Sequence, residues 1–192
     1  MSPRPLAFTD DQLLDAAAAA IAEIGPARLT LADVADRTGA SPATLVKRFG
    51  SKKGVLTALA DRAAGTIGGV FERSSRGTPL HRLEDALTAL AAGIETHQQM
   101  AHHVAFLVMD LTDADLHDRT RAFAAGLRSG VRAVLQDAQD TGELHCPDLD
   151  ELAHAVVTVY HGALITWAIE PDGDLRDCLL RRLRFALAPY RR

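Results

Sequence analysis

The first thirty residues carry apolar positions at the spacing of one helical face. Leu13, Ala17 and Ile21 follow one another every four residues, which is the repeat of an amphipathic α-helix. The preceding stretch 9–12, TDDQ, has the form of a capping box, in which the threonine and glutamine side chains satisfy free backbone amides. Gly25, which a proline follows, closes the pattern. These signals predict a first helix between positions 9 and 25.

Two short helical patterns follow. Thr30, with Asp33 three residues later, opens the first pattern, which breaks at Gly39. Ser41 then begins the second as an N-cap, with a proline at the first helical position, and this pattern runs to about Phe49. Helices this short are unstable alone, and a three-residue turn that contains glycine joins them. The pair therefore predicts a helix-turn-helix, with Gly39 at a positive φ.

The rest of the chain also has helical spacing, and alanine-rich composition with few β-branched runs favours helices further. We find no convincing strand signal. The prediction is an all-α fold of about nine helices, the later ones covering residues 52–73, 80–98, 101–111, 113–140, 149–169 and 174–189.

The charge is unevenly distributed along the chain. The whole chain has a net charge of -4, but residues 1–65 contain eight Lys or Arg and seven Asp or Glu. This third is slightly positive and the remainder is acidic, so the N-terminal third is the part suited to a polyanion. A basic stretch can also be no more than a solvated helix face, and charge alone leaves that alternative open.

The helical phase of residues 41–49 sharpens the first interpretation. At 100° per residue, one arc of this helix carries Ala43, Thr44, Lys47 and Arg48. The opposite side carries Leu45 and, one turn later, Phe49. Short side chains followed by basic ones suit a helix that enters the DNA major groove. We expect Lys47 and Arg48 to point outward, and Lys52 to lie near a flanking phosphate.

Two segments, LLDAAAAAIAEIG and LTLADVADRTGASPATLVKRFGSKKGVLTAL, resemble the N-terminal domain of the TetR family of bacterial transcriptional regulators. The resemblance covers about residues 11–60. It implies an all-α homodimer in which residues 1–54 form the DNA-binding domain, a helix over about 52–73 connects, and residues 55–192 form a ligand-binding and dimerisation domain. The implied partners are double-stranded DNA with a palindromic operator, a second copy of the chain, and a small apolar or amphipathic ligand.

The resemblance also implies which residues face DNA. They are Thr30, Ser41, Pro42, Ala43, Thr44, Lys47, Arg48 and Lys52. Where the family often has LYHYF, this chain has LVKRF, so Arg48 replaces a tyrosine that contacts phosphate. We therefore expect stronger salt dependence than an aromatic version would show, and Lys47 could donate to a guanine.

The family architecture places a ligand pocket and a dimer interface in the remaining helices. The candidate pocket residues are Met100, Phe106, Met109, Phe123, Leu127, Tyr160, His161 and Trp167. The candidate dimer residues are Leu175, Leu179, Leu183 and Ala186, one apolar stripe on the last helix. Each set has a simpler alternative, which is packing inside a single chain.

Other functional classes find little support in the sequence. No nucleophile–base pair, metal-ligand spacing or cofactor motif stands out, so we expect no catalytic residues, no metal and no cofactor. The N-terminus lacks a signal-peptide core, and the apolar stretch 152–169 reads as a buried helix rather than a membrane span. The prediction is a cytoplasmic repressor that a ligand releases from its operator. A helix-turn-helix regulator without a ligand, or less favourably an all-α enzyme or carrier, remains the alternative.

Overall fold

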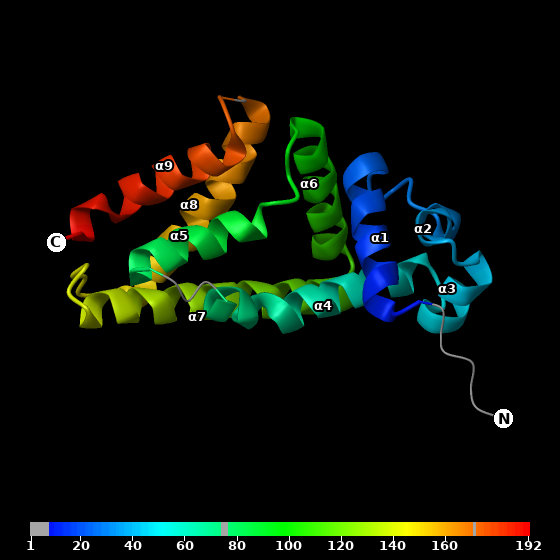
Figure 1. Cartoon of the computed structure of the whole chain (residues 1–192), viewed down its shortest axis with the longest axis horizontal. Helices are drawn as coiled ribbons and strands as arrows, with labels where there is room; N and C mark the ends of the chain where they lie inside the picture. The colour runs from blue at the N-terminus through cyan, green and yellow to red at the C-terminus, as the bar shows by residue number, and fades with distance from the viewer. Residues whose placement is uncertain (1–7, 74–76, 171) are drawn as a thin grey trace. The chain divides into compact units, whose positions relative to one another are not determined.

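The computed structural model describes residues 8–73, 77–170 and 172–192. Over these residues the fold is all-α, as predicted, and the only strand-like pairing is an isolated bridge between Leu144 and Arg191. The α-helices, labelled in Figure 1, are α1 (Asp10–Ile24), α2 (Leu31–Thr38), α3 (Pro42–Phe49), α4 (Lys52–Arg73), α5 (Pro79–Leu90), α6 (His97–Thr112), α7 (Ala114–Asp140), α8 (Leu149–Ile169) and α9 (Leu175–Leu187). The short 3-10 helix η1 (Ala188–Tyr190) follows α9.

The predicted starts of α1, α2 and α3 are confirmed by their caps. Thr9 and Gln12 form the reciprocal capping box of α1, and Thr30 forms one with Asp33 at α2. The Ser41 side chain accepts a hydrogen bond from the amide of Thr44, with the proline at the first turn of α3. Local sequence determined these boundaries because each cap uses residues only three positions apart.

The predicted helix over 80–98 is wrong, because α5 ends at Leu90 and α6 already begins at His97. Thr96 and Gln99 form a reciprocal cap at this break. The Gln99 side-chain oxygen accepts from the amide of Thr96 at 3.0 Å, and the amide of Gln99 donates to the Thr96 hydroxyl at 3.1 Å. The sequence TxxQ is the same signal that opens α1, and the alanine-rich run before it obscured the break.

The chain forms two compact units, and their boundaries fall inside α4, α6 and α7. The first contains the residues up to Arg62 together with Ala101–Arg119, and the second contains 63–100 and 120–192. This division differs from the predicted boundary after residue 54, because most of α6 and the start of α7 pack with the first three helices.

The core of the first unit explains why α6 belongs to it. Leu13, Val34 and Leu45 from α1, α2 and α3 are fully buried together, and Phe106 of α6 packs against the same cluster. His102, also on α6, donates from Nδ1 to a backbone carbonyl in the last turns of α1 over 2.8 Å. The helix-turn-helix is therefore supported by a helix that lies far away in the sequence.

In the second unit, α4 and α7 approach closely at two glycines. A Cβ atom added at Gly126 would lie 2.5 Å from the side chain of Ile67, and one at Gly130 would lie 2.3 Å from the ring of Phe71. Real side chains do not come this near, so Ile67 and Phe71 occupy space that only glycine leaves open. The glycine spacing of four residues places both gaps on one face of α7.

Helix α9 is held to α5 and α8, and the end of the chain closes against a loop. Arg184 donates from Nε and Nη2 to the two carboxylate oxygens of the buried Glu84 on α5, at 2.9 and 2.7 Å. After α9, the amide of Arg192 donates to the Glu143 carbonyl at 3.1 Å. The C-terminus therefore joins the loop between α7 and α8.

Helix α8 is the one described helix that is long and apolar enough to cross a membrane by length and composition. Leu152, Val156 and Leu164 are buried, and α8 packs along α9 within the second unit. Much of the apolar content of α8 is thus explained by a core position, as the sequence indicated.

Candidate nucleic-acid interface

The turn between α2 and α3 fixes the direction of both short helices. Gly39 has φ 74° and ψ 11°, the left-handed conformation that glycine adopts without steric cost. Ala35 and Leu45 are buried where the helices meet. At the start of α2, the hydroxyl and the amide of Thr30 both donate to a carboxylate oxygen of Asp33 at 2.7 Å. These hydrogen bonds favour the ionised acid and hold the pKa of Asp33 below its ordinary value.

The outer face of α3 carries the short and basic side chains that the helical phase predicted. Pro42, Ala43 and Lys47 are exposed, whereas Leu45 is buried on the opposite side. Thr44 is half-buried, and its hydroxyl lies 3.0 Å from that of Ser41. Within the described part of the chain, the side chain of Lys47 has neither a hydrogen bond nor an ion pair. Its ammonium group is therefore available to an external anion.

The expected outward orientation of Arg48 is wrong. Only 14% of its side chain is exposed, because the guanidinium turns toward the start of α1. Nη1 donates to the Asp10 carboxylate at 2.7 Å, and Nη2 donates to the backbone carbonyl of Phe8. Sequence reasoning missed these partners because they precede Arg48 by about forty positions.

The two lysines that open α4 have different partners. Lys52 donates from Nζ to the carbonyl of Ala27 at 2.7 Å, a neutral partner that leaves its charge uncompensated. Lys53 lies between Asp113 and Asp115, at 2.8 and 3.0 Å. The hydrogen bond to Asp113 is the main cause of a raised pKa of Lys53, and the same bond lowers the pKa of Asp113.

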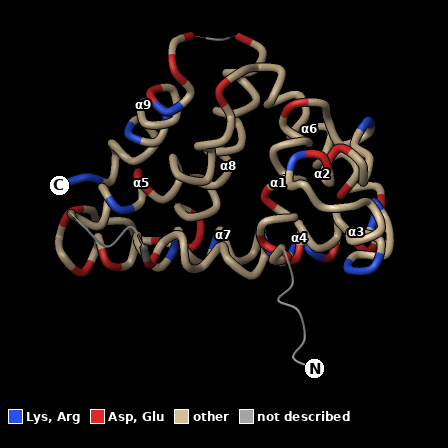
Figure 2. Tube along the Cα trace, turned by 45° about the vertical axis from the view of Figure 1, so that its right-hand side comes forward, with Lys and Arg blue, Asp and Glu red and all other residues tan. Residues whose placement is uncertain are grey.

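Most other cations of the first unit also have acidic partners. Basic positions gather at α3 and the start of α4, with acidic positions in the same unit (Figure 2). Arg37 pairs with Glu23, and Arg119 pairs with Asp61 at 2.6 Å. Among the lysines and arginines described in this unit, only Arg28 and Lys47 have a side chain without a hydrogen bond or ion pair. Arg28 is exposed in the turn before α2. The sequence analysis did not single it out as an unpaired cation, because the residues around it form no motif.

The eight candidate pocket residues do not line one cavity. Phe106 and Met109 pack on the core of the first unit, whereas Leu127 is fully buried in the second. His161 is exposed, and burial raises the pKa of the neighbouring Tyr160. Met100 is buried, and Phe123 is half-buried. Only Trp167 lines a cavity described below.

That cavity lies between α5, α8 and α9 of the second unit and has a volume of about 620 Å³. Ala89, Ile94 and Leu175 give it apolar walls, and Glu95 and Arg176 are among the charged residues that line it. Its size is within the usual range for small-molecule sites. The sequence signal for it was weak, because small alanines rather than Met or aromatic residues form much of the wall.

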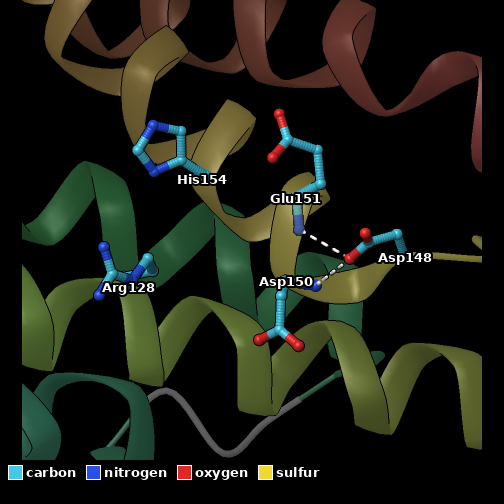
Figure 3. Close-up of a pocket in the computed structure, with 5 residues that line it drawn as sticks. All are labelled: Arg128, Asp148, Asp150, Glu151 and His154. Atoms are coloured by element: carbon cyan, nitrogen blue, oxygen red, sulfur yellow. Dashed lines mark hydrogen bonds between the residues drawn. The ribbon is translucent and has the colours of Figure 1, made fainter.

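A second cavity, about 360 Å³, opens at the start of α8 (Figure 3). Arg128 and His154 lie on one side of it, and acidic side chains lie on the other. The Asp148 carboxylate accepts from the amides of Asp150 and Glu151 at 3.1 and 3.0 Å, so its role is to cap α8. In the described part of the chain, no group of three or more His, Cys, Asp or Glu side chains is placed to hold a metal ion.

The predicted dimer stripe on α9 is wrong. Leu175, Leu179 and Leu183 are buried inside the chain, and Ala186 is half-buried. The exposed apolar residues in this region lie elsewhere: Phe185 is 81% exposed, and Ile169 on α8 is 73% exposed. Periodicity identified the apolar face of α9 correctly, but not that its partners are α5 and α8.

Comparisons with known proteins agree with this architecture. Residues 13–59 match the profile described as bacterial regulatory proteins, tetR family, and residues 79–188 match the profile described as BetI-type transcriptional repressor, C-terminal. The second match alone covers more than half of the chain. The chain belongs to the TetR family.

Among solved structures, SmeT is similar along nearly the whole length. SmeT is described as the repressor of the Stenotrophomonas maltophilia multidrug efflux pump SmeDEF. It is 26% identical, the match covers 96% of this chain and 91% of SmeT, and the TM-score is 0.69. A SmeT–triclosan complex matches at 24% identity, covering 95% of this chain and 91% of the other, with a TM-score of 0.70.

A TetR transcription regulator from Haloarcula marismortui has the same fold at lower identity. It is 18% identical, the match covers 95% of this chain and 98% of that one, and the TM-score is 0.79. A comparison with curated proteins finds no match. As a TetR-family member, the chain is a DNA-binding transcriptional regulator, and α1–α3 with the start of α4 form its helix-turn-helix region.

Proposed function

We propose that this TetR-family regulator is a repressor, binds a palindromic operator as a homodimer, and is released from it by a small molecule. The observation that carries the DNA part is Lys47, which is exposed and unpaired on the outer face of a capped, anchored α3. A regulator of this kind works on chromosomal DNA in the cytoplasm, without a membrane partner, and we assign it no catalytic activity.

The proposed DNA contacts come from the start of α2, from α3 and its N-cap, and from the start of α4. They are Thr30, Ser41, Pro42, Ala43, Thr44, Lys47, Arg48 and Lys52. Short side chains let the backbone of α3 approach the bases, and Lys47 reaches a base edge or a phosphate. A dimer would place two α3 helices in successive major grooves, roughly 34–36 Å apart.

Binding of the full-length protein to the DNA upstream of its own coding sequence tests this part of the proposal. We expect fluorescence anisotropy to show a saturable complex that unlabelled fragment displaces better than unrelated DNA. Lys47→Glu should abolish it, because a carboxylate on the outer face of α3 repels the phosphates. Equal binding by Lys47→Glu and the wild type would refute the role of this face.

For the dimer, we propose that the exposed surface of α8 and α9 is the contact, in place of the buried leucine stripe. Phe185 and Ile169 are large, apolar and mostly exposed, and Ile165 on α8 is 40% exposed. A second copy would remove these groups from water, which favours association.

Sedimentation at micromolar concentration tests the dimer contact. The wild type should be dimeric and Phe185→Glu should be monomeric, whereas Val108→Glu, at an exposed apolar position on α6, should remain dimeric. A monomeric wild type, or a dimeric Phe185→Glu variant, would contradict the assignment.

For the ligand, we propose the 620 Å³ cavity between α5, α8 and α9 as the binding site. Its lining combines alanine and leucine side chains with charged ones, which suits an amphipathic molecule. The SmeT–triclosan complex supports the idea that this fold accepts a small molecule. The ligand must bind the DNA-free state more tightly than the operator-bound state, because equal affinity would shift nothing.

A thermal-shift screen of amphipathic compounds that includes triclosan tests the cavity. A compound that binds the folded state raises Tm in a concentration-dependent way. Ala92→Phe fills part of the cavity and should remove the shift, while retaining operator binding. A compound that stabilises Ala92→Phe as much as the wild type would place the ligand site elsewhere.

A further inference from the structure

The last turn of α3 and the first turn of α1 meet at the guanidinium of Arg48. One nitrogen, Nη1, donates to the Asp10 carboxylate at 2.7 Å, and the other, Nη2, donates to the Phe8 carbonyl. The arginine is thus divided between a charged side chain and a backbone oxygen. Lys47, the neighbouring residue on α3, has no such partner in the described chain.

The two partners of Arg48 differ in how easily they are replaced. Phe8 is half-buried and packs against the core of the first unit, so its carbonyl is held in place. The Asp10 side chain is 66% exposed, whereas that of Arg48 is 14% exposed. An exposed carboxylate gains little net energy from an ion pair, since water solvates it well when it is released.

A DNA phosphate offers Arg48 the same chemistry that Asp10 offers. Both are anions whose oxygens accept short, charge-assisted hydrogen bonds from a guanidinium. If a phosphate replaced Asp10 at Nη1, the bond from Nη2 to Phe8 could remain, so the arginine would need little reorientation. The exchange would cost one weak ion pair and would release counterions from the DNA.

We propose that Asp10 is an internal substitute for a DNA phosphate. It holds Arg48 in place in the free protein and is displaced when the operator binds. Asp10 is thereby a residue that lowers the affinity for DNA and weakens its salt dependence, although it is not itself a DNA contact. This inference rests on the proposed contact between Arg48 and the DNA backbone.

A double-mutant cycle in the full-length protein tests this role. The variants are Asp10→Asn, Arg48→Met and the double variant, because methionine retains the packed stem of Arg48. Binding to duplex DNA from upstream of the coding sequence is measured between about 50 and 200 mM salt. Over this range, the affinity of a protein with several phosphate contacts falls steeply. Asp10→Asn should bind roughly two- to fivefold tighter, the fold-change that corresponds to one exposed ion pair.

Two measurements distinguish displacement of Asp10 by a phosphate from other effects: the salt dependence of DNA affinity and the double-mutant cycle. Asp10→Asn should steepen the dependence of log affinity on log salt by up to about 0.9, the value for one phosphate. In the Arg48→Met background, Asp10→Asn should have no effect beyond that of the control. The control is Asp11→Asn, since Asp11 is a neighbouring exposed acid of α1 that lies 3.7 Å from Arg62.

Each outcome separates this inference from the proposed function. If the wild type and Arg48→Met bind DNA equally, with equal slopes, the proposed contact of Arg48 fails. If Arg48→Met weakens binding but Asp10→Asn behaves like Asp11→Asn, only the role of Asp10 fails. If Asp10→Asn and Arg48→Met both weaken binding and both lower stability to urea, the pair only braces α1 against α3, and the inference is overturned.

Discussion

Each unit contains an ion pair that joins distant helices, and the two pairs differ in the burial of the acid. In the first unit, cations pair with exposed acids, as Arg48 does with Asp10. In the second unit, Arg184 is bound through two hydrogen bonds to Glu84, which is buried. Exposed pairs are weak and can exchange with solvent or another anion, whereas a buried acid left without its partner is costly. The first arrangement suits a surface that must accept DNA, and the second suits a fold that must keep its shape.

The largest effect of packing should come from the close approach of α4 and α7 in the second unit. Gly130→Ala places a Cβ 2.3 Å from the ring of Phe71, so the ring or the two helices must shift. Overpacking of this kind costs about 1–3 kcal/mol, and Tm should fall by several degrees in thermal unfolding. Gly65→Ala on α4 is the matched control, because its Cβ would meet no described atom within 4 Å. A control variant as unstable as Gly130→Ala would contradict this account.

The difference between buried and exposed ion pairs predicts how much stability is lost when each arginine is removed. Arg184→Met leaves the Glu84 carboxylate buried without its cation, whereas Arg132→Met leaves the exposed Asp150 in water. In urea unfolding, the first variant should lose roughly twice the stability of the second or more. Adding Glu84→Gln to Arg184→Met should restore part of the loss, because the amide carries no charge. Equal losses of stability in Arg184→Met and Arg132→Met would contradict the expected difference between the buried and the exposed pair.

Within the first unit, the presence or absence of an acidic partner predicts how much each lysine contributes to DNA affinity. Lys47→Ala should weaken binding and lower the salt slope by about 1, as expected for one lost phosphate contact. Lys53→Ala should change the slope much less, since Asp113 and Asp115 already neutralise that lysine. Anisotropy titrations at several salt concentrations measure both. The comparison would be reversed if Lys53→Ala had the larger effect on the slope.

The smallest effect should be a pH-dependent one at the cap of α2. The hydrogen bonds from Thr30 lower the pKa of folded Asp33 below the ordinary value of 3.8. A lowered pKa stabilises the fold above the unfolded value, and the contribution is lost as pH falls through the folded value. Asp33→Asn should therefore be slightly less stable than the wild type at pH 7, and the difference should shrink below about pH 3.8.

Urea unfolding at pH 7 and at pH 3 measures this change. Asp36→Asn, at an exposed position on the same helix, is the matched control. A difference between wild type and Asp33→Asn that grows on acidification would be the wrong sign.

Sequence predicted those features of the fold that depend on neighbours along the chain. The caps at Thr9, Thr30 and Ser41 each need partners three residues away, and all three were found. The same signal at Thr96 was overlooked, although it is equally local. The turn at Gly39 and the burial of Leu45 were also predicted, because the helix-turn-helix motif specifies both.

The features that sequence missed depend on distant partners. Arg48 and Asp10 are 38 residues apart, and Arg184 and Glu84 are 100 residues apart. A helical pattern shows that Arg48 lies on the outer side of α3, but not that α1 supplies an acid beside it. Likewise, the leucine stripe of α9 shows that one face is covered, but not whether the same chain or a second copy covers it. The proposed DNA contacts remain predictions for this reason.

The assignment of Ala101–Arg119 to the first unit has a consequence for how the protein is made. His102 contacts α1 and Asp113 contacts Lys53, so residues made later complete the contacts of the helix-turn-helix. During synthesis, which proceeds from the N-terminus, the ribosome must first produce the intervening segment 63–100. The DNA-binding unit therefore acquires its full set of contacts only after more than half of the polypeptide has been translated.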